Sequence, residues 1–186
     1  MAGIEFFDQV FEDDYCHRLL DYAKQCLAGG TSFGRSNFHW HREIVKASHL
    51  VLVMDLDEGK ADEIVLRLTA RGILNHPKFA VMIYAWTKLS YIPWHNDVGH
   101  AVAVTVFLND HWPIDWGGLF LYKDGADIRG YPPRFNTGLR NQGNVFHSTT
   151  PVSLDAETPR FTLQLFPREA GATNVVISPT ARTPTQ

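Results

Sequence analysis

The sequence of 186 residues has only two cysteines, no excess of positive charge and no long uninterrupted apolar run. Cys16 and Cys26 fall within one predicted helix, where ten residues at a rise of about 1.5 Å separate them by roughly 15 Å. That separation exceeds the reach of a disulfide bond. We therefore predict two reduced thiols, buried in the core or without a functional role.

The lack of basic residues limits the partners that the protein can bind. With 17 Lys and Arg against 20 Asp and Glu, the formal net charge is -3, so binding through phosphate neutralisation is not expected and we predict no nucleic-acid partner. The N-terminus is acidic where a secretory signal would be basic and apolar, and no stretch approaches the ~20 apolar residues of a membrane span. The pattern predicts a soluble, cytoplasmic protein without a membrane partner, and the oligomeric state stays open.

The length and the 45% hydrophobic content predict a single domain covering residues 1–186. Apolar spacing and flanking glycines predict one helix over residues 13–30 and a second over residues 60–71. Residues 37–56 between them favour one or two strands. The tail from about residue 171 is rich in Thr, Pro, Ala and Ser and is expected to be loosely ordered.

After Pro77 the texture changes to short β-branched and aromatic runs separated by Gly, Pro, Asn and Asp. These runs predict strands within residues 79–86, 90–97, 100–110, 117–124, 143–152 and 160–166. Helices followed by at least six short strands indicate a mainly β fold, a sandwich or barrel with the N-terminal helices packed on one outer face.

Three residues form a candidate metal site. His95 and Asp97 are two positions apart, so on an extended segment their side chains leave the same face. His147 interrupts an apolar strand fifty residues later. Alone, the first pair would fit a surface turn and the second histidine a buried core residue. Together, two imidazoles and one carboxylate match the ligand set of non-haem Fe(II) sites that handle O₂.

A candidate anion site follows on the next strand. Arg160, Thr162 and Gln164 share one strand face, and the intervening residues are apolar. An inward-facing guanidinium needs an anion, and it grips a carboxylate in bidentate fashion while a nearby hydroxyl donates to the same group. The alternative is a rim arginine in a surface ion pair.

Other groups carry weaker signals. Tyr84, Trp86 and Tyr91 are expected either to line a pocket or to fill an aromatic core. The triplet His39-Trp40-His41 offers two imidazoles on one face for a second metal or a substrate wall, without an evident carboxylate or cysteine partner. Three arginines precede His147 in a segment expected to form a lid, a rim or a solvated loop: Arg129, Arg134 and Arg140.

Residues 84–166 resemble the 2-oxoglutarate and Fe(II)-dependent oxygenases, in particular their prolyl-hydroxylase-like branch. The resemblance rests on the His95-x-Asp97 motif, the run AVAVTVFLNDHWPIDWGGLFLY, the segment Pro133-Arg134-Phe135-Asn136, and His147 followed by Pro151-Val152. Arg160-Phe161-Thr162 stands where the family has RxS. The order and spacing of these motifs make the combination far more specific than any one of them.

The resemblance implies a double-stranded β-helix, the cupin-like jelly roll. It implies that His95, Asp97 and His147 are the catalytic iron ligands and that 2-oxoglutarate chelates the iron, with its distal carboxylate held by Arg160 and Thr162. We add Tyr84 as a candidate co-substrate contact. The implied cofactors are Fe(II), 2-oxoglutarate and O₂, with ascorbate as a reductant in vitro.

The implied activity is hydroxylation of a C–H bond with release of succinate and CO₂; desaturation, epoxidation and cyclisation share the same chemistry. A compact chain without accessory domains favours a small-molecule or amino-acid-derived substrate over a peptide. Two alternatives use no 2-oxoglutarate: a metal-binding jelly-roll module without turnover, and a cupin-like isomerase or dioxygenase.

Overall fold

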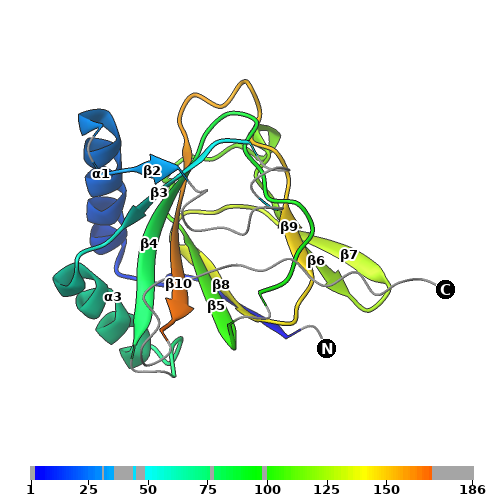
Figure 1. Cartoon of the computed structure of the whole chain (residues 1–186), viewed down its shortest axis with the longest axis horizontal. Coiled ribbons are helices and arrows are strands. Elements are labelled where there is room, and N and C mark those ends of the chain that lie inside the picture. The colour runs from blue at the N-terminus through cyan, green and yellow to red at the C-terminus, as the bar shows by residue number, and fades with distance from the viewer. Residues whose placement is uncertain are drawn as a thin grey trace.

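The structure is a computed structural model that describes residues 3–30, 32–35, 44, 49–75, 78–97 and 100–168 (Figure 1). Two earlier predictions lie outside these residues: the triplet at residues 39–41 as a second metal site, and the tail from residue 171.

Two helices precede most of the strands, as predicted. Helix α1 (Asp13–Gly29) ends where Gly30 adopts a left-handed conformation with φ of 69°, which glycine accepts without steric cost. Helix α3 (Glu58–Ala70) begins two residues before its predicted start. The carboxylate of Asp57 accepts a hydrogen bond from the Lys60 amide and so caps the first turn.

The strands of the described residues form two antiparallel sheets. The large sheet has the order β1-β8-β5-β10-β4-β3-β2 and the small sheet the order β7-β6-β9. His95 pairs with His147 through two backbone hydrogen bonds of 2.8 and 2.9 Å, which places the 92–95 segment beside β9. The strands are β1 (Ile4–Phe7), β2 (Gly34–Arg35), β3 (Val51–Asp55), β4 (Phe79–Trp86), β5 (Val102–Phe107), β6 (Phe120–Asp124), β7 (Asp127–Tyr131), β8 (Thr137–Gln142), β9 (His147–Thr149) and β10 (Arg160–Pro167).

The segment before His147 is not the loop or lid that the sequence pattern suggested. It contains β7, which is mostly exposed, and β8, which pairs with both β1 and β5. The polar run of β8, TGLRNQ, hides the alternation that marks a strand. Conversely, the predicted strand over residues 90–97 is reduced to an isolated bridge at His95. Beside it, the carbonyl oxygens of Ser90 and Ile92 accept hydrogen bonds from the backbone amides of Val152 and Thr149.

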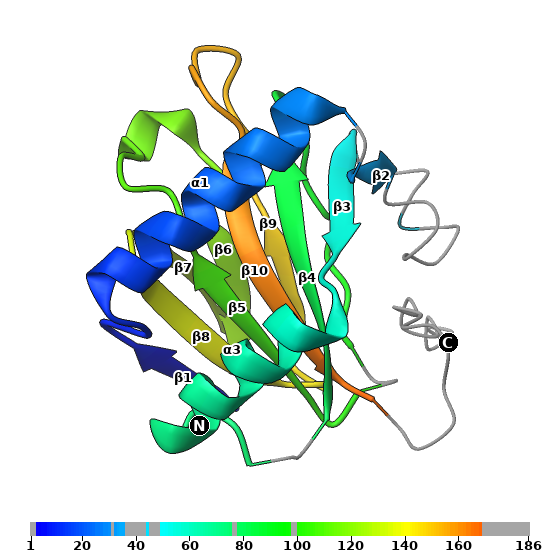
Figure 2. The same cartoon turned by 90° about the vertical axis from the view of Figure 1, so that its left-hand side faces the viewer.

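Three layers result, and they determine where a site can lie. Helices α1 and α3 cover one face of the large sheet (Figure 2), and the small sheet lies on the other side (Figure 1). Alternate residues of β4 and β10, such as Ile83 and Leu163, pack toward the helices in the main apolar cluster. Their neighbours Tyr84, Trp86 and Thr162 face the space between the sheets. In its described part, the fold is therefore mainly β with two α-helices on one outer face.

Two remaining sequence predictions concern thiols and membranes. Cys16 is buried and Cys26 is half-buried, and both are free thiols. No helix in the described ranges has the length and apolar character needed to cross a membrane.

Candidate metal and anion site

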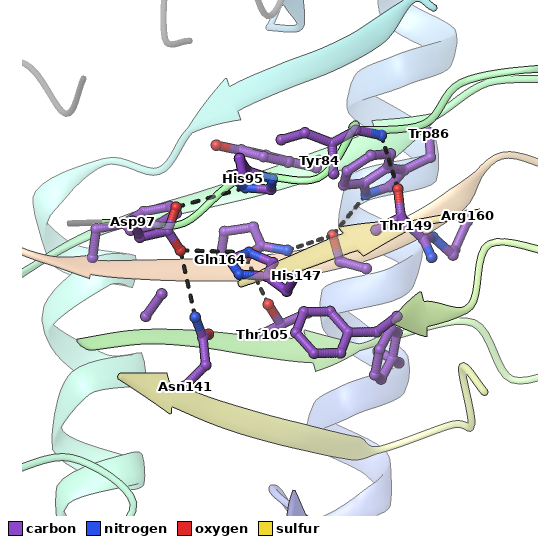
Figure 3. A pocket seen from close by; sticks show the side chains of 16 residues that line it. Tyr84, Trp86, His95, Asp97, Thr105, Asn141, His147, Thr149, Arg160 and Gln164 are labelled. Atoms are coloured by element: carbon purple, nitrogen blue, oxygen red, sulfur yellow. Dashed lines mark hydrogen bonds and ion pairs between the residues drawn. The ribbon is translucent and has the colours of Figure 1, made fainter. Parts of the chain in front are cut away.

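A cavity between the two sheets brings together all six residues that the sequence singled out for metal or co-substrate binding. It contains about 540 Å³ of empty space, part of it open to solvent. Figure 3 shows the arrangement. The lining residues are Tyr84, Trp86, Ile92, His95, Asp97, Ala103, Thr105, Phe107, Phe120, Asn141, His147, Thr149, Arg160, Thr162, Gln164 and Phe166.

His95, Asp97 and His147 have the geometry of a metal site. One ligand atom from each lies within 4.8 Å of the others, and all three side chains are buried. The Nε2 atoms of His95 and His147 lie 3.7 and 3.6 Å from the two carboxylate oxygens of Asp97. The pairing of His95 with β9 fixes the distance between the two imidazoles, whose ring centres are 4.2 Å apart.

Backbone carbonyls set the orientation and tautomer of both imidazoles. The Nδ1 atom of His95 lies 2.8 Å from the carbonyl oxygen of Pro93, and that of His147 lies 2.9 Å from the carbonyl oxygen of Val145. A carbonyl only accepts, so each Nδ1 carries the hydrogen and each Nε2 presents a lone pair to the cavity. Burial, followed by the proximity of His147, lowers the pKa of His95 to about 4, which keeps this ring neutral as a metal ligand requires.

The carboxylate of Asp97 is only partly satisfied by the described part of the chain. Its Oδ2 atom is 3.5 Å from the amide nitrogen of Asn141 on β8, whereas its buried Oδ1 atom accepts no hydrogen bond. A buried polar atom without a partner is costly unless a ligand or an ion satisfies it. The donor set and the unpartnered oxygen therefore fit a divalent metal. Asn141 was missed because β8 was taken for a loop.

Arg160, at the start of β10, is a buried cation with few partners. It is 2% exposed, donates from Nη1 to the carbonyl oxygen of Gly118, and has its guanidinium carbon 4.5 Å from the centre of the Trp86 ring. Its Nε atom has no acceptor, and no carboxylate of the described residues pairs with it. Burial lowers its pKa to about 9, so it stays protonated at neutral pH and the site favours an anion.

Gly118 makes room for the guanidinium of Arg160. The sequence analysis did not identify this role of the glycine. Its φ is 68°, and a Cβ atom there would lie 2.9 Å from Nη1 and 3.0 Å from Cδ of Arg160. Any other residue would therefore have to displace the arginine. The pair Gly117-Gly118 in the run DWGGLF was the available signal.

Thr162 and Tyr84 lie beside the arginine. The hydroxyl oxygen of Thr162 accepts hydrogen bonds from Trp86 Nε1 at 2.9 Å and from Gln164 Nε2 at 3.1 Å. Gln164 in turn accepts from the Thr105 hydroxyl at 2.8 Å. Tyr84 is 3% exposed, and its ring centre is 6.0 Å from that of Trp86.

The other candidates lie outside the cavity lining. Arg129 pairs with Asp124, Arg134 with Asp8 and Arg140 with Glu5. Arg140 also donates a hydrogen bond to the carbonyl oxygen of Ile73. It therefore links β8 both to β1 and to the segment that follows α3. Tyr91 is partly exposed and does not line the cavity.

Comparisons with known proteins find similarity in structure but not in sequence. No family model matches the chain, and no curated protein matches it significantly. A prolyl-4-hydroxylase from Pseudomonas putida superposes with a TM-score of 0.70 at 15% identity, covering 91% of this chain and 95% of that one. A prolyl hydroxylase from Trichoplax adhaerens, in complex with a hypoxia inducible factor peptide fragment, gives 0.68 at 15% identity, covering 90% and 84%.

A third similar structure belongs to an epimerase, not to a hydroxylase. The non-haem α-ketoglutarate-dependent epimerase SnoN from nogalamycin biosynthesis superposes with a TM-score of 0.62 at 14% identity, covering 89% of this chain and 77% of that one. All three matches extend over most of both chains. The chain therefore has the prolyl-hydroxylase-like fold of the 2-oxoglutarate and Fe(II)-dependent oxygenases.

Proposed function

We propose that the protein is a 2-oxoglutarate- and O₂-dependent non-haem Fe(II) dioxygenase that hydroxylates a C–H bond of its substrate. The observation that carries the proposal is one cavity with two features: a two-histidine, one-carboxylate set, and a buried arginine that has no carboxylate partner among the described residues. A metal-binding module or a cupin-like isomerase would use the first feature but has no need of the second.

The three candidate ligands suit iron. Two neutral imidazoles and a carboxylate on one side of a metal leave further coordination positions open, the arrangement used by non-haem Fe(II) oxygenases. Iron bound there would supply the activation of O₂ that is coupled to oxidative decarboxylation of 2-oxoglutarate to succinate and CO₂. His95, Asp97 and His147 would hold the metal, and the Nδ1 contacts of the two histidines would keep their lone pairs directed at it.

The anion site suits the far end of 2-oxoglutarate. Arg160 lines the cavity and its Nε has no acceptor among the described residues. A carboxylate beside it would neutralise a cation that is costly to bury alone. Thr162 would donate to the same carboxylate, and Tyr84 would form part of the wall. Charge-assisted hydrogen bonds of this kind are stronger than neutral ones.

The strand order supports a more specific fold assignment. Beside the large sheet, the small sheet extended by the His95 segment gives four strand segments in the order β7, β6, β9 and residues 92–95. From β4 onward, each connection crosses from one sheet to the other except the β6–β7 hairpin, which stays in the small sheet. This is the pattern of a double-stranded β-helix or jelly roll. We propose this topology within a single domain of residues 1–186.

The substrate proposal depends on the rest of the cavity wall. Apart from the polar groups already described, its lining is largely apolar and includes Ile92, Phe107 and Phe120. Such a wall suits a compact organic molecule, so we favour a small-molecule or amino-acid-derived substrate over a peptide. Cytoplasmic localisation stays a prediction.

The deciding experiment is an anaerobic titration of the Fe(II)-loaded protein with 2-oxoglutarate. We expect the weak visible metal-to-ligand charge-transfer band of the chelate, and succinate formation when O₂, ascorbate and a metabolite panel are added. Iron binding without this band would favour the binding module or the isomerase. Substrate-triggered decarboxylation within the panel would identify the substrate class.

A further inference from the structure

Trp86 contacts both groups of the anion site at once. On the basis of the proposed function, we propose that Trp86 is a positioning residue. It holds the side chains of Arg160 and Thr162 where both can contact the distal carboxylate of 2-oxoglutarate. One face of its ring carries the guanidinium, and its indole N–H donates to the threonine hydroxyl. The sequence identified Trp86 only as an aromatic residue of the pocket or core.

The sheet register explains why one side chain reaches both partners. Trp86 on β4 lies directly opposite Arg160 on β10, and Thr162 lies opposite Tyr84. Opposite and diagonal side chains on one face of antiparallel strands are close enough for a large aromatic group to contact both. All three side chains are at least 97% buried, so the contacts form away from competing water.

The indole also determines the direction in which Thr162 donates. A hydroxyl group has two acceptor positions and one hydrogen. Trp86 Nε1 and Gln164 Nε2 occupy both acceptor positions of Thr162. The hydroxyl hydrogen must therefore be donated to a different acceptor, and Thr162 lines the same cavity as Arg160.

The guanidinium is positioned in a similar way. The Gly118 carbonyl accepts a hydrogen bond from Nη1, and the guanidinium carbon lies over the Trp86 ring. Cation-π contacts with tryptophan are the strongest of the aromatic set and gain strength when desolvated. Trp86 thus contributes one contact to each carboxylate donor while lacking a place among the candidate metal ligands.

The test compares binding of two chelators to the anaerobic Fe(II)-loaded full chain. 2-Oxoglutarate uses both the metal and the anion site, whereas oxalate has the metal-chelating end and no distal carboxylate. In Trp86→Phe, which keeps a ring and loses the N–H, we expect the 2-oxoglutarate Kd to rise about two- to tenfold, the worth of one hydrogen bond. Oxalate and iron affinities should stay unchanged. Trp86→Leu, which also loses the ring, should bind 2-oxoglutarate more weakly still.

A double-mutant cycle tests whether the indole acts through the hydroxyl. If it does, Trp86→Phe combined with Thr162→Val should bind 2-oxoglutarate no more weakly than Thr162→Val alone. The matched control is Trp116→Phe, a half-buried tryptophan outside the cavity lining, which should leave both chelators unaffected.

Each contrary result has a distinct meaning. A wild-type protein that binds iron but not 2-oxoglutarate would overturn the proposed function itself. If the wild type binds and Trp86→Phe has the same 2-oxoglutarate Kd, or loses oxalate affinity equally, the positioning role of Trp86 is wrong. Additive effects in the double variant would also overturn it. Should Trp86→Leu fail to fold, Trp86→Phe and the cycle still decide the question.

Discussion

The two faces of β10 are both buried, but only one of them carries polar side chains. Phe161, Leu163 and Leu165 point toward helices α1 and α3 and are at most 1% exposed. Arg160 and Thr162 point into the cavity and are at most 2% exposed. Burial alone therefore does not distinguish the structural side of the strand from its candidate functional side.

The two faces differ in whether their buried polar atoms have hydrogen-bond partners. The helix-facing side contributes apolar groups whose burial stabilises the fold. The cavity side keeps two buried polar atoms without partners among the described residues, Asp97 Oδ1 and Arg160 Nε. Unpaired buried groups cost stability, so their presence indicates places where a ligand is needed. The comparison predicts that mutations on one face affect unfolding and those on the other affect binding.

The largest expected effect is on the cavity side, in His95→Ala and His147→Ala. Each variant should lose stoichiometric iron binding and all measurable turnover, because one of three proposed ligands is removed. The fold should persist, since packing on the helix-facing side supports it. Metal analysis and circular dichroism provide the measurements, and unfolding of either variant would instead make that histidine a core residue.

The opposite result is expected from Leu163→Ala on the other face of the same strand. Truncating a fully buried leucine should lower the free energy of unfolding by about 2–5 kcal/mol through lost burial and a residual cavity. Below the unfolding transition, iron affinity should be unchanged. Chemical denaturation with parallel iron titration measures both, and a selective loss of iron affinity would break the separation of the two faces.

A smaller effect is expected from Arg160→Leu. Losing a charge-assisted contact should raise the 2-oxoglutarate KM by about ten- to a hundredfold without changing iron affinity. Arg160→Lys should restore only part of it, because a point charge lacks the two-pronged geometry. Succinate formation at saturating iron gives the three KM values. Equal values would make Arg160 a structural arginine.

The smallest effect concerns Cys16 in the helix-facing core. Burial raises the pKa of its thiol from 9.0 to about 12, so the folded protein keeps the thiol neutral where the unfolded chain would ionise it. The contribution of this thiol to the free energy of unfolding is therefore fully present below pH 9 and is lost as the pH rises toward 12. At pH 8, a thiol reagent should label Cys26 in the native protein and Cys16 only after unfolding. If the folded Cys26→Ser variant were labelled as fast as the folded wild type, Cys16 would be the reactive thiol and this prediction would be wrong.

The sequence predicted those parts of the molecule that local patterns encode. The alternation of β10 assigned Arg160 and Leu163 to opposite faces, and helix periodicity located both helices. Asn141, Gly118 and the double role of Trp86 escaped prediction, because each depends on which strands lie side by side. That register is determined by contacts between distant segments, which no local pattern records.

Strand β10 also occupies the middle of the large sheet, between β4 and β5, although it follows both in the chain. During synthesis, β4 and β5 therefore emerge before the strand that must be inserted between them. Until β10 is in place, each of these strands has an unpaired edge, and the cavity lacks both Arg160 and Thr162. The proposed affinity for 2-oxoglutarate would thus require β10 to be in place, so an immobilised dicarboxylate would retain chains that contain their central strand and let chains without it pass.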